Sequence, residues 1–246
     1  MIGEWLRRAE RKSSKVFSSF PQECDAGAFY GAMQERIKEL GSPDCLKKFR
    51  YEGGERRITD CNFFVAVLAD EIARKSGMRV AMPYDEDRSP LSEMIGGGYR
   101  VVYPCLDVRK IELTRPYNAM ILGRVVQLVR EKEEKEEISF PFRVSGLELV
   151  AEEGGYGINV APIGGDLSKF EILHDDRLSY FCGNGRFNKV DKKGLPIFVC
   201  EGRRSWFAKG DGIAGVGIGR DGDLHSEWSD LNVFYSDCQV IVLPND

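Results

Sequence analysis

The stretch "RRITDCNFFVAVLADEIARKSG", from Arg56 to Gly77, places a polar turn directly before an apolar segment. Its apolar residues recur at the spacing of one helical face, which predicts an amphipathic helix seated against a sheet. We expect Thr59 or Asp60 to cap this helix, so that Cys61 lies in its first turn. The helix is expected to end at Gly77, because basic residues followed by glycine are typical of helix C-termini.

Helical patterns dominate the first half of the chain on both sides of this stretch. They cover residues 26–40, a short segment from residue 42 and a long segment at 114–137. Two strand-like segments, 78–84 and 97–113, lie among these helices. After Ile138, short runs of alternating apolar and polar residues are broken by glycines and Asp-Gly turns, which predicts antiparallel β-structure.

These patterns predict an α+β fold: N-terminal helices, a cysteine-bearing helix, then a mainly antiparallel β-sheet. Residues 1–137 form the mainly helical part with two strands, and residues 138–246 form the β-rich part. We expect these two parts to make one compact domain or two intimately packed halves.

Composition and charge restrict the class of protein. The 246 residues carry a net charge of −4, so strong nucleic-acid binding is not expected. No apolar run approaches the roughly 20 residues that span a bilayer, and the first residues lack the apolar core of an export signal. We therefore expect a cytoplasmic protein as synthesised, with delivery by phage lysis or a secretion machine as an alternative.

The N-terminal segment 2–20 combines an apolar helical stripe with basic residues. We favour a terminal helix that docks on its own domain, because the basic face needs only water. Contact with a membrane surface or with a partner's groove is the alternative.

The chain has seven cysteines, an odd number without any C-x-x-C pair. This spacing argues against a zinc ribbon and against a fully paired disulfide framework, and a reducing compartment is the simpler interpretation. The two histidines, His174 and His225, form no metal-binding pattern. We therefore expect neither a metal nor another cofactor.

Cys61 has two interpretations. Free N–H groups and the positive dipole at a helix start stabilise a thiolate, which is the form that attacks a carbonyl. The same position lies on the buried stripe of the helix, where a cysteine acts as a small apolar residue.

The stretch around Cys61 resembles the nucleophile helix of papain-like cell-wall hydrolases of the NlpC type, which include amidase effectors and phage lysins. The matching positions are Thr59, Cys61, Asn62, Phe64, Val65 and Gly77, about twenty residues in span. The resemblance implies a cysteine peptidase or amidase that needs no cofactor and cleaves a peptidoglycan-type or isopeptide substrate. It also implies a histidine at the start of a strand, where this chain has Tyr156 and Gly157.

His174 is the first choice for the general base. Residues 155–173 are expected to form a hairpin around Gly164–Asp166, which sets His174 opposite Ile158. A neighbouring carboxylate or amide can orient an imidazole toward a thiolate. The candidate orienting residues are Asp175, Asp176 and Asn159, and His225 is the alternative base.

Two hypotheses of function follow. In the first, the protein is a thiol hydrolase with Cys61 as nucleophile and His174 as base. In the second, it is a non-catalytic binding or adaptor protein, or an inactivated relative of the hydrolases, and its β-rich half presents a partner surface.

Overall fold

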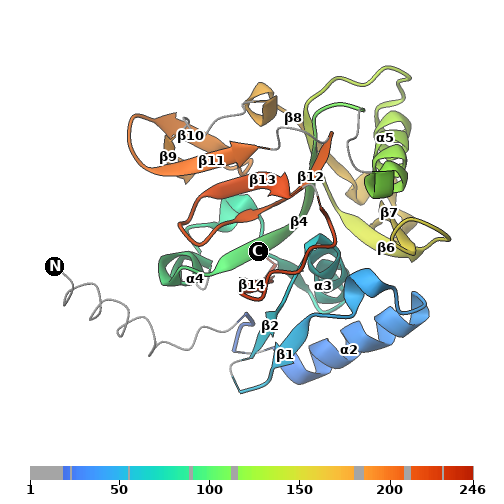
Figure 1. Ribbon diagram of the computed structural model, residues 1–246, viewed down its shortest axis with the longest axis vertical. Helices are drawn as coiled ribbons and strands as arrows, with labels where there is room; N and C mark the ends of the chain where they lie inside the picture. The colour runs from blue at the N-terminus through green and yellow to red at the C-terminus, as the bar shows by residue number, and fades with distance from the viewer. Residues whose placement is uncertain are drawn as a thin grey trace.

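The computed structural model describes residues 19–245 except 23, 55, 89–90, 112–115, 180–185, 208–211 and 229. The helix expected at residues 2–20 therefore lies almost entirely outside the described residues. Within the described ranges, no helix is both long and apolar enough to cross a membrane. Helices and strands are mixed along the chain, which confirms the α+β class (Figure 1).

The helices follow their capping and packing signals. They are α2 (Ala26–Glu39), α3 (Phe63–Lys75), α4 (Leu91–Gly97) and α5 (Ala119–Glu133). The prediction for residues 26–40 is confirmed: the side chain of Asp25 caps α2 by accepting bonds of 3.0 Å from the N–H groups of Gly27 and Ala28. The long helix is shorter than predicted, because residues 116–118 form a 3-10 turn and Glu134 turns left-handed at φ 55°.

Most strands belong to one large sheet. Its members are β4 (Arg100–Val108), β5 (Phe142–Ser145), β8 (Glu171–His174), β9 (Arg186–Val190), β10 (Pro196–Val199), β11 (Arg203–Phe207), β12 (Ile213–Ile218), β13 (Leu224–Trp228) and β14 (Cys238–Gln239). The order is β10-β9-β11-β13-β12-β4-β5-β8, and β14 pairs with β4. Most neighbours are antiparallel, while β11–β13 and β14–β4 are parallel. β4 of the first half therefore lies among strands of the second half.

Three two-stranded sheets surround this large sheet. They pair β1 (Arg50–Glu52) with β2 (Arg57–Thr59), β3 (Met78–Val80) with β15 (Val242–Pro244), and β6 (Leu147–Ala151) with β7 (Ile158–Pro162). Every one of these pairs is antiparallel. The pairing of β3 with β15 brings the end of the described chain back against the segment after α3.

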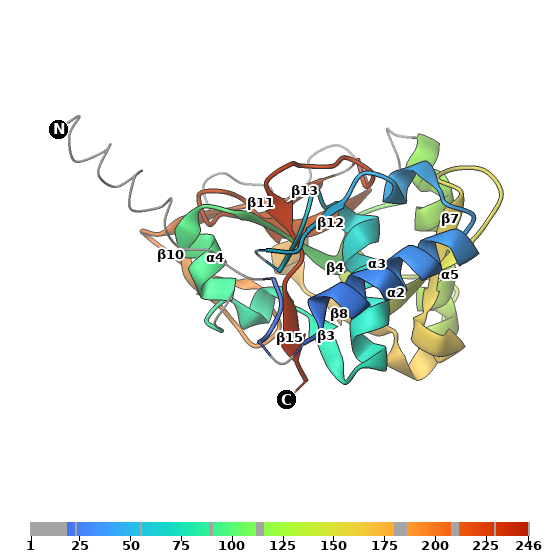
Figure 2. The same ribbon diagram turned by 90° about the horizontal axis from the view of Figure 1, so that it is seen from below.

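β4 is the central strand and is buried on both faces. Val102 and Leu106 point into the core shared with α2, α3 and α5, whereas Val101 and Tyr103 point into a second core with α4. Figure 2 shows α2, α3 and α5 gathered on one side of β4 and α4 on the other. The two cores explain why the sequence of this strand is almost continuously apolar.

Pro104 lies inside β4, where a proline cannot donate a ladder hydrogen bond. The partner strand β12 matches Gly215 to Leu106 but Gly217 to Val102, so β4 has two extra residues between these pairs. This bulge accommodates the missing N–H of Pro104 in a central strand.

The predicted hairpin around Gly164–Asp166 is wrong. β7 pairs with β6, and β8 pairs with β5, so that His174 lies opposite Phe142 rather than Ile158. Two 3-10 turns separate β7 from β8, including η5 (Leu167–Lys169). The two strands bury their apolar residues against different partners, and this long-range packing overrides the local turn signal.

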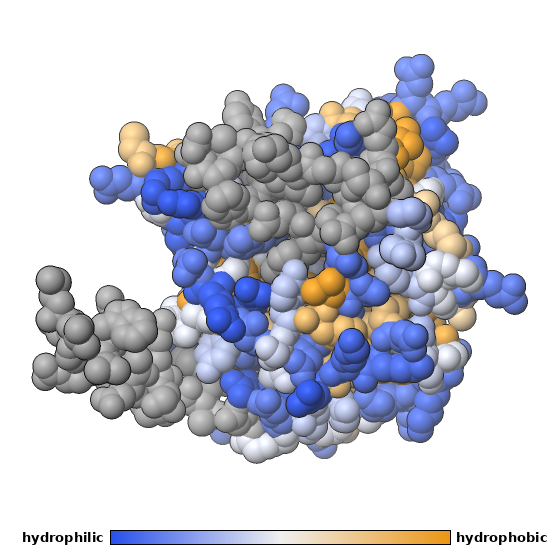
Figure 3. All heavy atoms as spheres, in the orientation of Figure 1, coloured by the Kyte–Doolittle hydropathy of each residue, from blue (hydrophilic) through white to orange (hydrophobic). Residues whose placement is uncertain are grey.

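The large sheet ends in two edge strands, β8 and β10. On β10, Ile197, Phe198 and Val199 are each 37–38% exposed. Figure 3 shows apolar surface over the β9–β10 hairpin, at the upper left of the view. β8 borders a cavity instead, and that cavity is described below.

Candidate functional site

Cys61 precedes α3 rather than lying in its first turn. The helix is capped by Asn62, whose Oδ1 accepts a 2.9 Å hydrogen bond from the N–H of Val65. The predicted cap at Thr59 or Asp60 is therefore wrong. Asp60 instead turns the chain with a φ of 56°, and its carboxylate pairs with Arg50 at 2.9 Å.

The backbone of Cys61 is bound to the C-terminal part of the chain on both sides. Its N–H donates to the carbonyl of Cys238 at 3.3 Å, and its carbonyl accepts from the N–H of Tyr235 at 3.4 Å. Cys61 and Tyr235 form an isolated antiparallel bridge. This bridge brings the segment around Tyr235 against Cys61.

The thiol of Cys61 is fully buried, with 0% of the residue exposed. Its Sγ donates a 3.4 Å hydrogen bond to the carbonyl of Ile58. Burial raises the pKa of this thiol well above its ordinary value, and the charges of Cys238 and Asp60 raise it further, against a hydrogen bond from the backbone of Val240. The cavity beside Cys61 has a volume of about 10 Å³. A cavity of this size does not admit a substrate, and the protonated thiol is the stable form.

His174 is bound to α5. Its Nε2 lies 2.7 Å from Oε1 of Glu133, and its ring packs on Phe142 with centroids 5.7 Å apart. The side chain of His174 is 34% exposed, so it is accessible from solvent. Glu133, which the sequence analysis did not select, is the carboxylate that orients this imidazole.

The sheet register places Cys61 and His174 at opposite ends of β4. Cys61 lies next to Cys238, which pairs with Arg100, whereas His174 pairs with Phe142, which pairs with Val108. The distance between these two ends can be measured along the partner strand β12, where Ile218 pairs with Val101 and Ile213 pairs with Val108. Five residues of strand separate Ile213 from Ile218, which is about 17 Å at the usual strand rise. Direct proton transfer needs a heavy-atom separation near 3 Å, so this arrangement does not unite the two residues.

The expected orienting residues have other roles. Asp175 accepts hydrogen bonds of 2.9 and 2.7 Å from the guanidinium of Arg177. Asn159 is buried in β7 and donates from Nδ2 to the carbonyl of Met120 at 3.4 Å. Asp176 opens the 3-10 turn η6 (Asp176–Ser179). The hydrogen bonds of Asp175 and Asn159 therefore stabilise local structure at their own positions.

The alternative base and the replaced histidine position each have other contacts. His225 lies in β13 between Gly217 of β12 and Trp206 of β11. Tyr156, at the position where the resemblance implies a histidine, packs on Phe64 with ring centroids 4.9 Å apart. Its hydroxyl donates to Oδ1 of Asn118 at 2.7 Å. Tyr156 thus packs on α3 and links it to the start of α5.

A cavity of about 640 Å³ lies along the edge strand β8, and we call it the β8 groove. One wall comes from the end of α5 and from η5, and the other from η2 (Pro83–Asp85) and the β9–β10 turn. Strands β5 and β8 form its floor. The lining residues are Met82, Tyr84, Lys132, Glu133, Arg143, Ser145, Ser168, Phe170, Glu171, Ile172, Leu173, Lys192 and Lys193.

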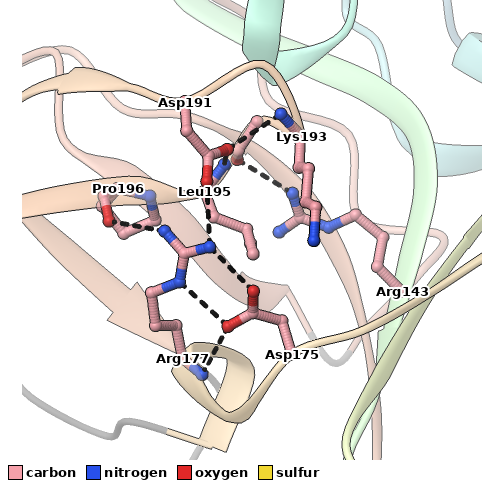
Figure 4. A network of polar contacts seen from close by, with 8 residues as sticks. Arg143, Asp175, Arg177, Asp191, Lys193, Leu195 and Pro196 are labelled. Atoms are coloured by element: carbon pink, nitrogen blue, oxygen red, sulfur yellow. Dashed lines mark hydrogen bonds and ion pairs between the residues drawn. The ribbon is translucent and has the colours of Figure 1, made fainter.

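A buried ion pair supports the floor of the β8 groove. Asp107 of β4 and Arg143 of β5 are cross-strand neighbours, with Nε–Oδ1 and Nη2–Oδ2 distances of 2.6 and 2.9 Å. Burial opposes the charge of Arg143, but the charge and hydrogen bonds of Asp107 outweigh it and raise the pKa of the guanidinium. Arg143 also donates to the carbonyl of Gly194 at 3.1 Å, which joins the sheet to the β9–β10 turn (Figure 4).

A second arginine holds the other side of this turn. Arg177 bridges Asp175 and Asp191, with Nη2–Oδ2 distances of 2.7 and 2.9 Å (Figure 4). Oδ1 of Asp191 accepts bonds of 2.8 and 3.1 Å from the N–H groups of Lys193 and Leu195. The turn that carries Lys192 and Lys193 is therefore fixed from two directions.

Sequence reasoning missed this groove and its supporting ion pair. The available signal was a charged residue inside an otherwise apolar strand: Asp107 in "VVYPCLDV" and Arg143 in "FPFRVS". Charged residues are rarely buried unless they are paired, so each one predicts a partner across the sheet. Which residue is the partner depends on the strand order, which the sequence does not show.

Comparisons with protein-family models, with curated proteins and with solved structures find no match to this chain. Within the described ranges, no group of three histidine, cysteine or acidic residues could hold a metal ion.

Proposed function

We propose that this protein is a non-catalytic binding protein, with an architecture like that of an inactivated thiol hydrolase, and that its β-rich half carries the partner surface. The observation that supports this proposal most strongly is the burial of Cys61, whose residue is 0% exposed and whose thiol pKa is raised. A catalytic cysteine needs the opposite environment, in which the thiolate is stabilised and a substrate carbonyl can reach it.

Two N–H groups at the start of α3 are already bound within the fold. An oxyanion hole needs N–H groups that are free to bind a developing negative charge. The N–H of Val65 is bound by the side chain of Asn62, and the N–H of Cys61 is bound by the carbonyl of Cys238. These two donors thus stabilise the fold.

The β8 groove is the partner surface that we favour. It combines a cavity of about 640 Å³ with half-buried apolar residues and several charged side chains. Cavities of this size with convergent polar groups are the usual location of binding sites. Its walls come from both halves of the chain, and its floor lies in the β-rich half.

The second candidate function is a thiol hydrolase that cleaves a peptidoglycan-type or isopeptide substrate. It is favoured by one observation: Cys61 directly precedes Asn62, the cap of α3, and α3 packs on the large sheet. Catalysis would require the segment around Tyr235 to leave Cys61 and a base to approach from elsewhere.

For either function we propose a reducing, cytoplasmic setting, which the exposed free thiol of Cys200 supports.

Alkylation across pH distinguishes the two functions. The native protein would be treated with iodoacetamide between about pH 5.5 and 9, and Cys61 labelling would be followed by peptide mass spectrometry. The exposed thiol of Cys200 serves as an internal reference. We expect Cys61 to stay unlabelled across this range while the exposed Cys200 is alkylated.

The variant His174→Ala provides the control for a thiolate–imidazole pair. If Cys61 labels rapidly below pH 7 in the wild type and slowly in this variant, the thiol hydrolase replaces the binding protein as the assigned function. Equal protection of Cys61 in both proteins supports the binding function.

A further inference from the structure

We propose that the β8 groove binds an acidic segment of another protein in extended conformation, as an additional strand beside β8. The assignment rests on the binding function proposed above and names the partner of the same surface. It follows from an edge strand, a groove that follows this edge, and an excess of amines around it.

β8 is the last strand of the large sheet. Residues Glu171 to His174 pair with Ser145 to Phe142 of β5 on one side. On the opposite side of β8, no further strand is present within the described part of the chain. An edge strand presents N–H and C=O groups to which an extended peptide can add by main-chain hydrogen bonds.

The groove has walls on both faces of this edge. Lys132, Glu133 and Ser168 lie on the wall from α5 and η5, while Tyr84, Lys192 and Lys193 lie on the opposite wall. Ile172 and Leu173 are half-buried in the floor and point to alternate faces. Successive side chains of an added strand would therefore alternate between the two walls.

The charges of the groove favour an acidic occupant. Three amines, those of Lys132, Lys192 and Lys193, line the groove against two carboxylates, those of Glu133 and Glu171. The charge of Arg143 is balanced by Asp107. Nζ of Lys132 donates to the carbonyls of Leu167 and Ser168, at 2.9 and 3.3 Å, and these neutral acceptors leave its charge in place.

Lys192 and Lys193 extend this excess of positive charge to the opposite wall. Among the described residues, neither ammonium group has an ion pair within 4.0 Å. The turn that carries them is held by Arg177 and by the contact of Arg143 with Gly194. A fixed turn presents both amines without a backbone ordering cost on binding, which favours recognition of carboxylates.

The length of β8 sets the length of the bound segment. Four residues of strand span about 13 Å, so the groove matches a segment of about four to six residues. Acidic residues at alternate positions would face Lys192 and Lys193 on one wall, and the apolar residues between them would face the wall from α5 and η5.

The test uses the whole chain and a fluorescein-labelled peptide of four Glu-Val repeats flanked by glycines, with binding followed by fluorescence anisotropy. We expect saturable binding that weakens at least about fivefold when both lysines are reversed in Lys192→Glu/Lys193→Glu. The matched control is Lys189→Glu, which reverses an exposed charge of β9 outside the groove and should leave the affinity unchanged. Raising the salt concentration should weaken binding to the wild type.

Two further peptides test the proposed mode of binding. A Lys-Val peptide of the same length should not bind, and a Glu-Val peptide with N-methylated backbone amides on alternate residues should bind at least about tenfold more weakly, because it loses main-chain donors. Equal binding of the N-methylated peptide, equal binding of the Lys-Val peptide, or no saturable binding at about 1 mM protein would each overturn the assignment. Self-association of the chain that is abolished by the lysine reversals would also overturn it, in favour of a second copy as occupant.

These outcomes are independent of the test of the binding function. If Cys61 resists alkylation and the Glu-Val peptide does not bind, the binding function stands and its partner is not an acidic strand. If Cys61 alkylates rapidly and the peptide binds, the groove is an accessory site of an active hydrolase.

Discussion

Nε2 of His174 and Oε1 of Glu133 lie 2.7 Å apart, so that the edge strand β8 is joined to the end of α5 at the rim of the β8 groove. The contact gives His174 a structural partner that does not involve Cys61. The side chains of the pair are 34% and 20% exposed, which places it among partly solvated ion pairs of modest strength.

We predict that His174→Ala lowers the free energy of unfolding by about 1 kcal/mol or less. The physical reason is that solvent screens the lost contact with Glu133. Urea denaturation at pH 6 would measure the change, with Glu133→Gln as the matched variant that removes the same charge interaction. A loss above about 3 kcal/mol would show that His174 is part of the core rather than of the groove rim.

The Asp107–Arg143 pair is predicted to behave as a buried unit. Arg143→Met leaves Asp107 as an isolated buried carboxylate and should lower the free energy of unfolding by about 3–5 kcal/mol. The double variant Asp107→Leu/Arg143→Met removes both charges and should recover at least half of that loss. Chemical denaturation of the wild type, of Arg143→Met, of Asp107→Leu and of the double variant measures the coupling. Additive losses in the double variant would contradict the account of a tightly coupled pair.

Acid stability should depend on Arg177. Its hydrogen bonds lower the pKa of Asp175. Burial alone would raise the pKa of Asp191, but hydrogen bonds from the N–H of Leu195, from Arg177 and from the N–H of Lys193 outweigh it and lower the pKa. A carboxyl with a lowered folded-state pKa contributes stability above its unfolded pKa, near 4, and loses it as the pH falls through the folded value.

Arg177→Gln should therefore be less stable than the wild type at pH 7, by about 1 kcal/mol, and the difference should shrink below pH 4. Thermal denaturation between pH 2.5 and 7 tests this prediction. Lys189→Gln is the control, because it removes a positive charge from β9 that the Arg177 network does not use. A difference that is constant across the range would contradict the assigned role of Arg177.

The sequence predicted the elements that depend on local signals. The helical pattern of residues 26–40 and the basic residues before Gly77 place the boundaries of α2 and the end of α3 within one or two residues. The start of α3 was misplaced because Thr59, Asp60 and Asn62 are all good caps. In the structure, Asp60 adopts a left-handed turn and its carboxylate pairs with Arg50, so that Asn62 is the residue that caps α3.

The arrangement of the site depended on pairings that no local pattern encodes. β8 and β7 flank a glycine turn and yet belong to different sheets, so His174 lies beside Glu133 instead of near Cys61. The C-terminal segment that covers Cys61 is more than 170 residues away in the sequence. Whether a helix-start cysteine is reactive or buried depends on such long-range contacts, and the twenty residues around Cys61 do not contain them.

The most direct test of the central claim is the rate at which Cys61 is alkylated in the native protein as urea is added below the unfolding transition. The account predicts that Cys61 labels only when the protein opens, so that its rate is several orders of magnitude below that of Cys200 without urea and rises steeply with urea. Rapid labelling of Cys61 without urea, at a rate that does not change with sub-denaturing urea, would contradict the account and assign the thiol to an open, reactive site.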